Sequence, residues 1–346
     1  MISGQSASTA GGASLTSERH TPWLDLLWLE VTAKCNLRCV HCYSESGPQR
    51  RLHEHMSPED WEDALDQAAT LGCRAVQFIG GEPTMYPALP ALIERARVLG
   101  FDTIEVYTNG TTFKPRIKDA LLRHRVNLAF SVYAADSETH DRVTQREGSF
   151  ESTLASIQWA LESDLCVRAG IIEMDANAGQ AQQAKERLQE MGVRNIGIDR
   201  ARGVGRGANE YTAASPFDEL CGACWRGKLA ITAAGQIFPC VFSRFCQVGH
   251  VDQGLKTVLE GIPLHAFRHR MQQERAQLIA DCNPDTCGPD TCAPTTHCTP
   301  QECSPVVGCR PDQVCNPDTC RPSGCTPSEC IPATCSPPIH CRPDAD

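Results

Sequence analysis

Short apolar runs alternate with segments of helical periodicity through most of the chain, and this order constrains the fold more than any other feature. Strands that alternate with helices form parallel sheets with right-handed crossovers, and six such units suffice for an incomplete barrel. We therefore predict an α/β fold built on a partial (β/α)6 TIM-type barrel. The predicted strands cover 26–32, 75–80, 103–109, 127–133, 166–174 and 195–201, and the predicted helices cover 57–71, 87–99, 115–124, 150–163 and 178–191.

Composition indicates which residues are disordered and which compartment and partners the protein has. Residues 1–22 are mainly Ser, Gly, Ala and Thr, which bury little, and we predict that they are disordered. The sequence contains neither an apolar run of about 18 residues nor a secretion signal, so we expect a cytoplasmic protein with no membrane partner. A formal net charge of -10 without a basic patch argues against a nucleic-acid partner.

Three cysteines directly follow the first predicted strand, in the segment KCNLRCVHCY. Cys35, Cys39 and Cys42 have the spacing CxxxCxxC, and chemistry in such barrels lies at the carboxyl ends of the strands. Three thiolates on one loop suit an iron–sulfur cluster or zinc, and they leave one metal position open for another ligand. Buried cysteines without a metal, or a structural zinc completed by His41, are the alternatives.

This loop resembles that of the radical S-adenosylmethionine (SAM) enzymes, and the resemblance extends over residues 24–260. In that family CxxxCxxC is followed by an aromatic residue, here Tyr43, and holds a [4Fe–4S] cluster to which SAM binds. The resemblance implies this cluster on the three cysteines. It also implies reductive cleavage of SAM to a 5′-deoxyadenosyl radical that abstracts a substrate hydrogen, while the protein orients and shields the cofactor.

Motifs after the second and third strands resemble the same family. GGEP at 80–83 matches a family element in which glycines permit close approach of the backbone and a carboxylate suits the ammonium group of SAM. A plain turn before a helix is the alternative. YTNG at 107–110 resembles the family's turn near SAM after the third strand.

The fourth and fifth strands complete the resemblance. FSVYAADSETHDRVTQREGSF is similar to the family's SVxG…HDxxxG…GSF segment, which implies that Ser131 contacts the SAM ribose or carboxylate and that Arg142 pairs with the methionine carboxylate. A surface position is the alternative for Arg142. The strand AGIIEM resembles the adenine-binding strand, where Ile171 or Ile172 packs on the base, with ordinary core packing as the alternative. The SAM-binding residues implied by the resemblance are Tyr43, Gly80, Gly81, Glu82, Pro83, Asn109, Ser131, Arg142 and Ile172.

A second group of cysteines follows the barrel. Cys224, Gly235 and Cys240, separated by ten and by four residues, are similar to the opening signature of the SPASM or twitch extension of radical SAM peptide maturases. Apolar alternation predicts a β-hairpin that turns near Gly235 and brings Cys240 toward Cys221 and Cys224. With Cys246 as a fourth ligand, we predict one auxiliary [4Fe–4S] cluster. A zinc site with the same thiolates is the alternative.

The chain after a last predicted helix at 264–279 is a short repeat. From Cys282 onward, cysteines recur every five or six residues, and each is followed by any residue and then proline. Such a density of proline excludes helix and central strand, and too few apolar residues accompany it to form a core. Three hypotheses stay open: a metal- or cluster-binding appendage, a substrate-like peptide carried on its own enzyme, and a disordered tail.

These observations divide the chain into a disordered N-terminus (1–22), a barrel (23–210), a truncated SPASM-like extension (211–281) and a Cys-x-Pro tail (282–346). The resemblance implies a radical SAM enzyme that modifies a ribosomally made peptide and receives electrons from an external donor. Because no N-terminal peptide-recognition domain is visible, a leader peptide would need a separate binding protein. A radical SAM enzyme of small molecules and a non-catalytic iron–sulfur storage or sensing protein are the alternative functions.

Overall fold

Nine strands form one sheet in the part of the chain that the structure describes. The computed structural model describes residues 24–221, 224 and 226–281. In space the strands follow the order β6-β5-β4-β3-β2-β1-β7-β8-β9, and neighbours from β6 to β7 are parallel. The strands are β1 (Leu26–Glu30), β2 (Ala75–Ile79), β3 (Thr103–Thr108), β4 (Asn127–Val132), β5 (Val167–Glu173), β6 (Asn195–Arg200), β7 (Lys228–Ile231), β8 (Gln236–Phe238) and β9 (Gly249–His250).

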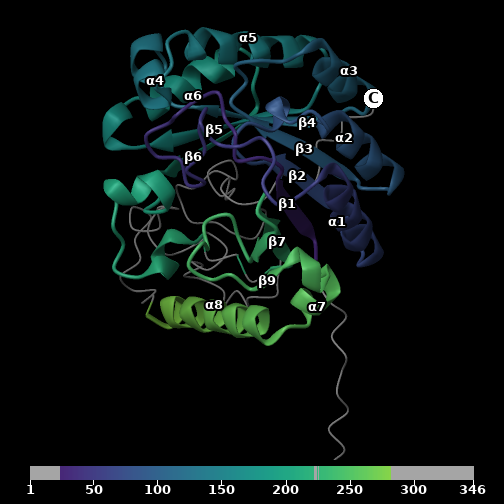
Figure 1. Ribbon diagram of the computed structural model, residues 1–346. Helices are drawn as coiled ribbons and strands as arrows, with labels where there is room; N and C mark the ends of the chain where they lie inside the picture. Colours follow the sequence, from purple (N-terminus) through teal and green to yellow (C-terminus); the bar gives the residue numbers. More distant parts are fainter. Residues whose placement is uncertain (1–23, 222–223, 225, 282–346) are drawn as a thin grey trace, which may run out of the picture.

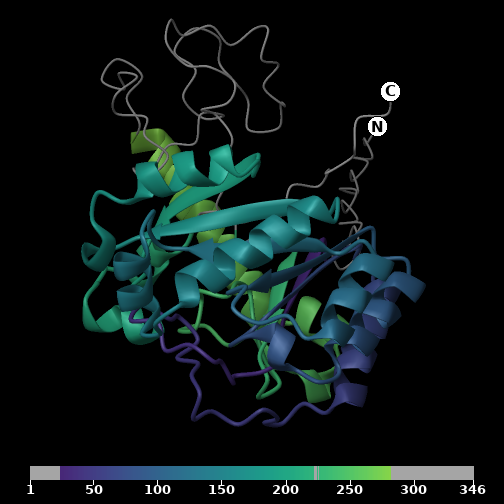
Figure 2. The same ribbon diagram turned by 90° about the horizontal axis from the view of Figure 1, so that it is seen from above.

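Helices cover the outer face of the six parallel strands β1–β6, and the view from above in Figure 2 shows them on one side of the curved sheet. The predicted partial (β/α)6 barrel is therefore confirmed. On the other side of β1, the strands β7–β9 and the last helix form the lower part of the molecule in Figure 1. The helices are α1 (Pro58–Thr70), α2 (Leu89–Val98), α3 (Pro115–Arg123), α4 (Ser137–Thr144), α5 (Ser149–Glu162), α6 (Ala181–Glu190), α7 (Leu255–Leu259) and α8 (Ile262–Asp281).

Alternation along the strands separates an apolar outer face from a polar inner face. Val76 and Phe78 of β2 are buried in the main core, whereas Gln77 between them donates a hydrogen bond to Glu105 of β3. Arg168 of β5 binds the same carboxylate through Nε (2.8 Å) and Nη2 (2.7 Å). Because successive side chains of a strand point to opposite faces, the helices cover the apolar face. On the inner face, the Glu105–Arg168 ion pair joins β3 to β5, and the Gln77 hydrogen bond adds β2.

The helix ends follow from local sequence. Ser57 caps α1: its Oγ accepts a hydrogen bond from the backbone N–H of Asp60 (3.2 Å), and the Asp60 carboxylate accepts one from the backbone N–H of Ser57 (2.8 Å). This reciprocal pair satisfies two N–H groups that a helix N-terminus otherwise leaves without partners. Trp61 and Leu65 then lie on the buried face.

Most elements lie within three residues of their predicted bounds, and two short helices, α4 and α7, were not predicted. The predicted hairpin is confirmed, because β7 and β8 are antiparallel and Gly235 takes the left-handed φ of +79° that the turn requires. No helix in the described ranges is both long and apolar enough to cross a membrane. Residues 1–22 and the Cys-x-Pro tail lie outside the described residues.

Candidate functional site

The loop that carries the three cysteines follows β1, at the carboxyl edge of the parallel strands, as the barrel hypothesis requires. Two backbone hydrogen bonds hold it to the end of α4: Arg38 N–H donates to the carbonyl of Thr144 (3.2 Å), and Val40 N–H to that of Val143 (3.1 Å). The helix that was not predicted therefore supports the cysteine loop.

Two thiols of this loop, those of Cys35 and Cys39, lie in surroundings that oppose ionisation. Burial and the nearby Glu82 carboxylate raise the pKa of Cys35 to about 12. Burial raises the pKa of Cys39 as well, and the neighbouring Cys42 and Cys35 add to that rise. The protein alone therefore keeps these thiols neutral near pH 7, and they become thiolates only when a cation such as iron compensates the charge.

The three sulfur atoms do not all lie as close together as a single tetrahedral ion would hold them. In the described part of the chain, one group places three His, Cys, Asp or Glu ligand atoms within 4.8 Å of one another, and it is not this triad. A single tetrahedral zinc with bonds of about 2.3 Å holds its sulfurs about 3.8 Å apart. His41, the alternative fourth zinc ligand, instead packs its ring edge-on against Tyr133, with ring centroids 4.9 Å apart. The donor set fits an iron–sulfur cluster better than structural zinc.

The two glycines after β2 pack against the backbone that leads from β1 into the cysteine loop. Gly81 N–H donates to the carbonyl of Thr32 (2.6 Å), and a Cβ added to Gly81 would lie 2.2 Å from the carbonyl oxygen of Lys34. Gly80 has a φ of +136°, and its Cβ would lie 2.5 Å from the Thr32 oxygen. These glycines are therefore needed for the close approach of two protein segments, a requirement that stands beside any contact with a ligand.

The carboxylate of Glu82 joins the turns after β2 and β3. It is buried and accepts hydrogen bonds from the N–H (3.0 Å) and hydroxyl (2.6 Å) of Thr84, from the hydroxyl of Thr108 (2.7 Å) and from the N–H of Asn109 (2.8 Å). Burial raises the pKa of this carboxyl, and the donors act in the opposite direction. Pro83 follows as the first residue of a 3-10 turn, η1 (Pro83–Met85). Three of the four bonds go to Oε1, so Oε2 keeps capacity for another donor.

Asn109 extends this network to the cysteine loop. Its side-chain Nδ2 lies 3.7 Å from the Sγ of Cys35 and donates to Oδ1 of Asn36 (2.9 Å). Its Oδ1 accepts from the N–H of Thr111 (2.9 Å). The cysteine loop, the GGEP turn and the turn after β3 are therefore brought together, as their positions in the sequence predict.

Ile172 of β5 also lies on the side of the cysteine loop. It belongs to an apolar cluster with Cys39 and Tyr133, whereas Ile171 is buried in the main core under the helices. Tyr133 in turn forms a side-chain hydrogen bond with Ser131. Of Ile171 and Ile172, the two residues considered for packing on the adenine, Ile172 is therefore the one on the inner side. It is also the one that the resemblance implies as a SAM-binding residue.

Arg142 is placed differently. Its side chain on α4 is 52% exposed, and it donates to the carbonyl of Ala176 (2.9 Å), which lies in the 3-10 turn η2 (Asp175–Asn177). The structure thus shows Arg142 joining α4 to the segment after β5, and its role toward a methionine carboxylate stays a prediction.

Sequence reasoning missed a buried group that connects the cysteine loop to the extension. Arg244, which follows Cys240, forms a salt bridge with Glu30 at the end of β1, and Glu30 also hydrogen-bonds Tyr43. The guanidinium carbon of Arg244 lies 5.5 Å from the centroid of the Tyr43 ring. No local pattern signals this group, because Arg244 lies 214 residues from Glu30.

Arg206 is a second residue that sequence reasoning missed. Its Nε donates to the carbonyl of Cys39 (2.8 Å), and its backbone N–H donates to the carbonyl of Cys42 (3.0 Å). The glycines of the segment RARGVGRG could have indicated this close approach to the cysteine loop. A Cβ on Gly205 would lie 2.5 Å from the Cys42 oxygen. Glycine at this position lets the segment after β6 reach the cysteine loop.

A cavity of about 330 Å³ opens between the cysteine loop and the β7–β8 hairpin. The residues that border it come from the barrel and from the extension alike. Among them are Glu30, Tyr43, Gly80, Gly205, Phe238 and Arg244.

Three cysteines of the extension also come together. Cys224 is buried, and its pKa is raised by side-chain hydrogen bonds with Cys221 and Cys240, then by burial. Cys246 is partly buried against the apolar cluster that contains Cys224 and Cys240, and burial alone raises its pKa. The thiol contacts therefore join Cys221, Cys224 and Cys240, while the ligand role of Cys246 stays a prediction.

Comparison with known proteins agrees with this geometry. The family model described as the Radical SAM superfamily matches residues 29–174. The antilisterial bacteriocin subtilosin biosynthesis protein AlbA of Bacillus subtilis is 23% identical over 255 residues, which cover 64% of this chain and 56% of that protein. A GTP 3′,8-cyclase of Desulforamulus reducens is 32% identical over 144 residues, which cover 41% of this chain and 44% of that protein.

Among solved structures, SuiB of Streptococcus suis has the same fold, with a TM-score of 0.58 and 18% identity over 72% of this chain and 68% of that one. SuiB bound to its precursor peptide SuiA gives a TM-score of 0.53, with 16% identity over 71% of this chain and 66% of that one. The chain spans about half the length of the two curated relatives.

Proposed function

We propose that this protein binds a [4Fe–4S] cluster and SAM at its cysteine loop and modifies a substrate by hydrogen abstraction, because residues 29–174 match the model of the radical SAM superfamily, whose members use both. One observation carries the proposal. Glu82 and Asn109 join the three predicted SAM-site turns in one hydrogen-bond network at the carboxyl edge of the sheet.

The residues of the chain divide the work of holding and positioning. Cys35, Cys39 and Cys42 would hold the iron, and the Asn109 amide 3.7 Å from the Cys35 sulfur would stabilise a thiolate there by donating to it. Glu82 keeps the turns in register, and its Oε2 offers an acceptor for the SAM ammonium group. When bound, the cluster supplies the electron for reductive cleavage of SAM.

A local apolar cluster beside the cysteine loop provides the remaining contacts. Ile172 and Tyr133 lie in one cluster with Cys39, so they would exclude water from the cofactor and pack against its nucleoside. Ser131, hydrogen-bonded to Tyr133, would contact the ribose or carboxylate. Exclusion of water protects a reactive cofactor from side reactions, which is the main contribution of the protein in such chemistry.

We propose a ribosomally made peptide as the substrate. AlbA is named for the biosynthesis of a bacteriocin, and a SuiB structure holds a precursor peptide. The cavity between the cysteine loop and the hairpin supports this proposal, because a peptide side chain entering it would lie next to Tyr43 and Gly80. The second candidate is a small molecule, which the 32% identity to a GTP 3′,8-cyclase favours.

The extension would hold an auxiliary cluster on Cys221, Cys224 and Cys240. We further propose an external electron donor and a separate leader-peptide-binding protein as partners. With 21 cysteines in the chain, a reducing cytoplasm is the compartment in which free thiols and clusters persist.

The substrate is tested with the full-length protein, reconstituted anaerobically with iron and sulfide. The protein is incubated with SAM, dithionite and either the short peptides encoded beside its gene or GTP, and products are analysed by mass spectrometry. We expect the wild-type protein to change the mass of one of these peptides, and Cys39→Ala to leave that mass unchanged. A product from GTP, with every peptide unchanged, would replace the peptide proposal by the small-molecule one.

A further inference from the structure

A group of two histidines and one aspartate lies at the edge of the hairpin, on residues to which the proposed function assigns no role. The Nε2 of His55 is 3.5 Å from Oδ1 of Asp252, and the Nδ1 of His250 is 3.0 Å from Oδ2 of Asp252. One ligand atom from each residue lies within 4.8 Å of the other two. Two imidazoles and a carboxylate are a donor set that binds divalent transition metals.

The hydrogen bonds of His250 assign its ring nitrogens. Nε2 lies 3.1 Å from the carbonyl oxygen of Ala234, which only accepts, so Nε2 carries the hydrogen. Nδ1 lies 3.4 Å from the backbone nitrogen of Asp252, so in the neutral ring Nδ1 carries the lone pair. The 3.0 Å approach of Nδ1 to a carboxylate oxygen is stabilised either by a proton on Nδ1 or by a metal cation that binds both atoms. Metal-bound histidines in proteins characteristically donate their other N–H to a carbonyl in this way.

The backbone brings the three side chains together from both parts of the molecule. His55 precedes α1, and its N–H donates to the carbonyl of Ala233 at the β7–β8 turn (3.0 Å). His250 ends β9, and Asp252 lies in the 3-10 turn η5 (Val251–Gln253). A Cβ on Gly235 would lie 2.7 Å from Nε2 of His250 and 3.0 Å from Cδ2 of His55, so glycine at the turn makes room for both imidazoles.

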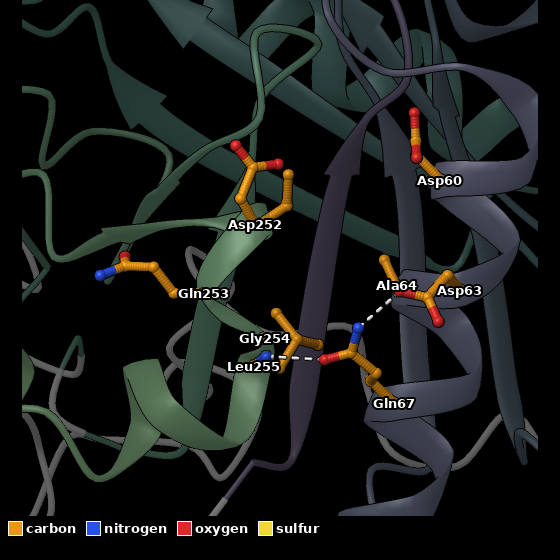
Figure 3. A pocket seen from close by; sticks show the side chains of 9 residues that line it. Asp60, Asp63, Ala64, Gln67, Asp252, Gln253, Gly254 and Leu255 are labelled. Atoms are coloured by element: carbon orange, nitrogen blue, oxygen red, sulfur yellow. Dashed lines mark hydrogen bonds between the residues drawn. The ribbon is translucent and has the colours of Figure 1, made fainter.

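An acidic pocket adjoins this group. A cavity of about 410 Å³ lies between η5 and α1, and Asp252 lines it together with Asp60 and Asp63. Figure 3 shows Asp252 across the pocket from α1, which carries Asp60, Asp63 and Gln67. Below them Gln67 accepts from the N–H of Leu255 (2.7 Å), which ties the two walls together. The carboxylates create a negative potential that favours a cation, and the open side of the pocket supplies water to its free coordination positions.

We propose that His55, His250 and Asp252 bind one divalent transition-metal ion of the zinc class, and that this ion fastens the C-terminal extension to the barrel segment before α1. The site differs from the cysteine sites in its ligands and in its place. The Nε2 of His55, the Nδ1 of His250 and one carboxylate oxygen of Asp252 are the protein ligands, and water completes the shell.

The test must separate this site from the many thiols, so it follows the histidines themselves. The full-length protein, labelled with ¹⁵N-histidine, is titrated with Zn²⁺, and long-range ¹H–¹⁵N spectra report each ring nitrogen. His55→Gln and His250→Gln assign the signals. We expect the His55 Nε2 and His250 Nδ1 signals to move together to metal-bound positions and to return on addition of a chelator.

Asp252→Asn is the decisive variant, and Asp63→Asn is its matched control, because it removes a carboxylate from the same pocket but not from the ligand set. Even a change of a residue that only supports a metal ligand weakens binding about 10- to 100-fold, so we expect Asp252→Asn to lose at least that much affinity and Asp63→Asn to keep it. His55→Gln should abolish the shift of His250 as well. Unmoved signals in wild type, equal shifts in Asp252→Asn, or a His250 Nδ1 that carries a proton in the presence of Zn²⁺ would overturn the proposal. Zinc bound by thiols elsewhere does not move these signals, and neither does the presence or absence of SAM cleavage.

Discussion

Replacing Arg244 by methionine should destabilise the protein strongly, although Arg244 lies outside every predicted ligand set. Its guanidinium pairs with Glu30, and the two side chains are only 22% and 7% exposed. Burial already raises the pKa of Glu30, and the charge of Arg244 opposes that rise. Arg244→Met would leave Glu30 buried without its cation, and removal of one partner from a buried pair costs about 3–5 kcal/mol.

The change is measured as the shift of the thermal unfolding midpoint of the anaerobic protein. At about 2–4 °C per kcal/mol for large domains, the expected fall is about 6–20 °C. Arg125→Met is the matched control, because Arg125 and Asp164 form an exposed pair with side chains 66% and 91% accessible, and such pairs contribute about 0–1 kcal/mol.

A double variant separates the pair from general loss of packing. Glu30→Gln together with Arg244→Met removes both charges, so we expect it to be more stable than Arg244→Met alone, and the two effects not to add. If Arg244→Met lowered the midpoint no more than Arg125→Met, the buried pair would not join the extension to the cysteine loop as argued above.

Three further predictions concern the site and its support. Gly81→Ala should lower the free energy of unfolding by about 1–3 kcal/mol and impair iron incorporation, because its Cβ would lie 2.2 Å from the Lys34 oxygen. Gly47→Ala is the control and should incorporate iron normally, because its Cβ would lie 3.9 Å from the Leu37 oxygen. Equal iron contents in the two variants would contradict this reasoning. Asn109→Ala should reduce iron retention during gel filtration, since it removes the amide next to the Cys35 sulfur. Gln158→Ala, on the exposed face of α5, is the control and should retain iron; equal retention by the two variants would show that Asn109 does not support the cluster. Burial lowers the pKa of His140 to about 4, so the unfolded state binds more protons than the folded state below about pH 6.5. The free energy of unfolding should therefore fall by about 3 kcal/mol as the pH drops from about 6.5 to 4. Urea titrations should show a weaker pH dependence for His140→Asn, and an unchanged pH dependence would refute this prediction.

The barrel was predictable because its strands carry an apolar outer face. Val76 and Phe78 alternate with Gln77, and the helices that cover them have a buried stripe bounded by recognisable caps such as Ser57. The short helix α4 escaped prediction because its sequence SETHDRVT is largely polar. Its signal was Asp136, whose carboxylate caps the helix by accepting from the N–H of Thr139 (2.8 Å).

The candidate site was predictable where it rests on local motifs and not where it rests on distant contacts. The cysteine loop and the GGEP and NG turns follow consecutive strands, so their meeting at one edge follows from the topology. Glu30 and Arg244 are 214 residues apart, and nothing near either residue indicates the other. The same holds for His55 and His250, which meet only because the hairpin turn lies against the segment before α1.

The central claim, SAM chemistry at the cysteine loop, is tested most directly by measuring 5′-deoxyadenosine. The full-length protein is reconstituted anaerobically and incubated with SAM and dithionite, and the nucleoside is quantified by mass spectrometry. We predict its formation by wild type and by Cys73→Ala, which changes a buried cysteine outside the loop, and its absence with Cys39→Ala. No 5′-deoxyadenosine from an iron-loaded wild type, or an equal amount from Cys39→Ala, would contradict the account.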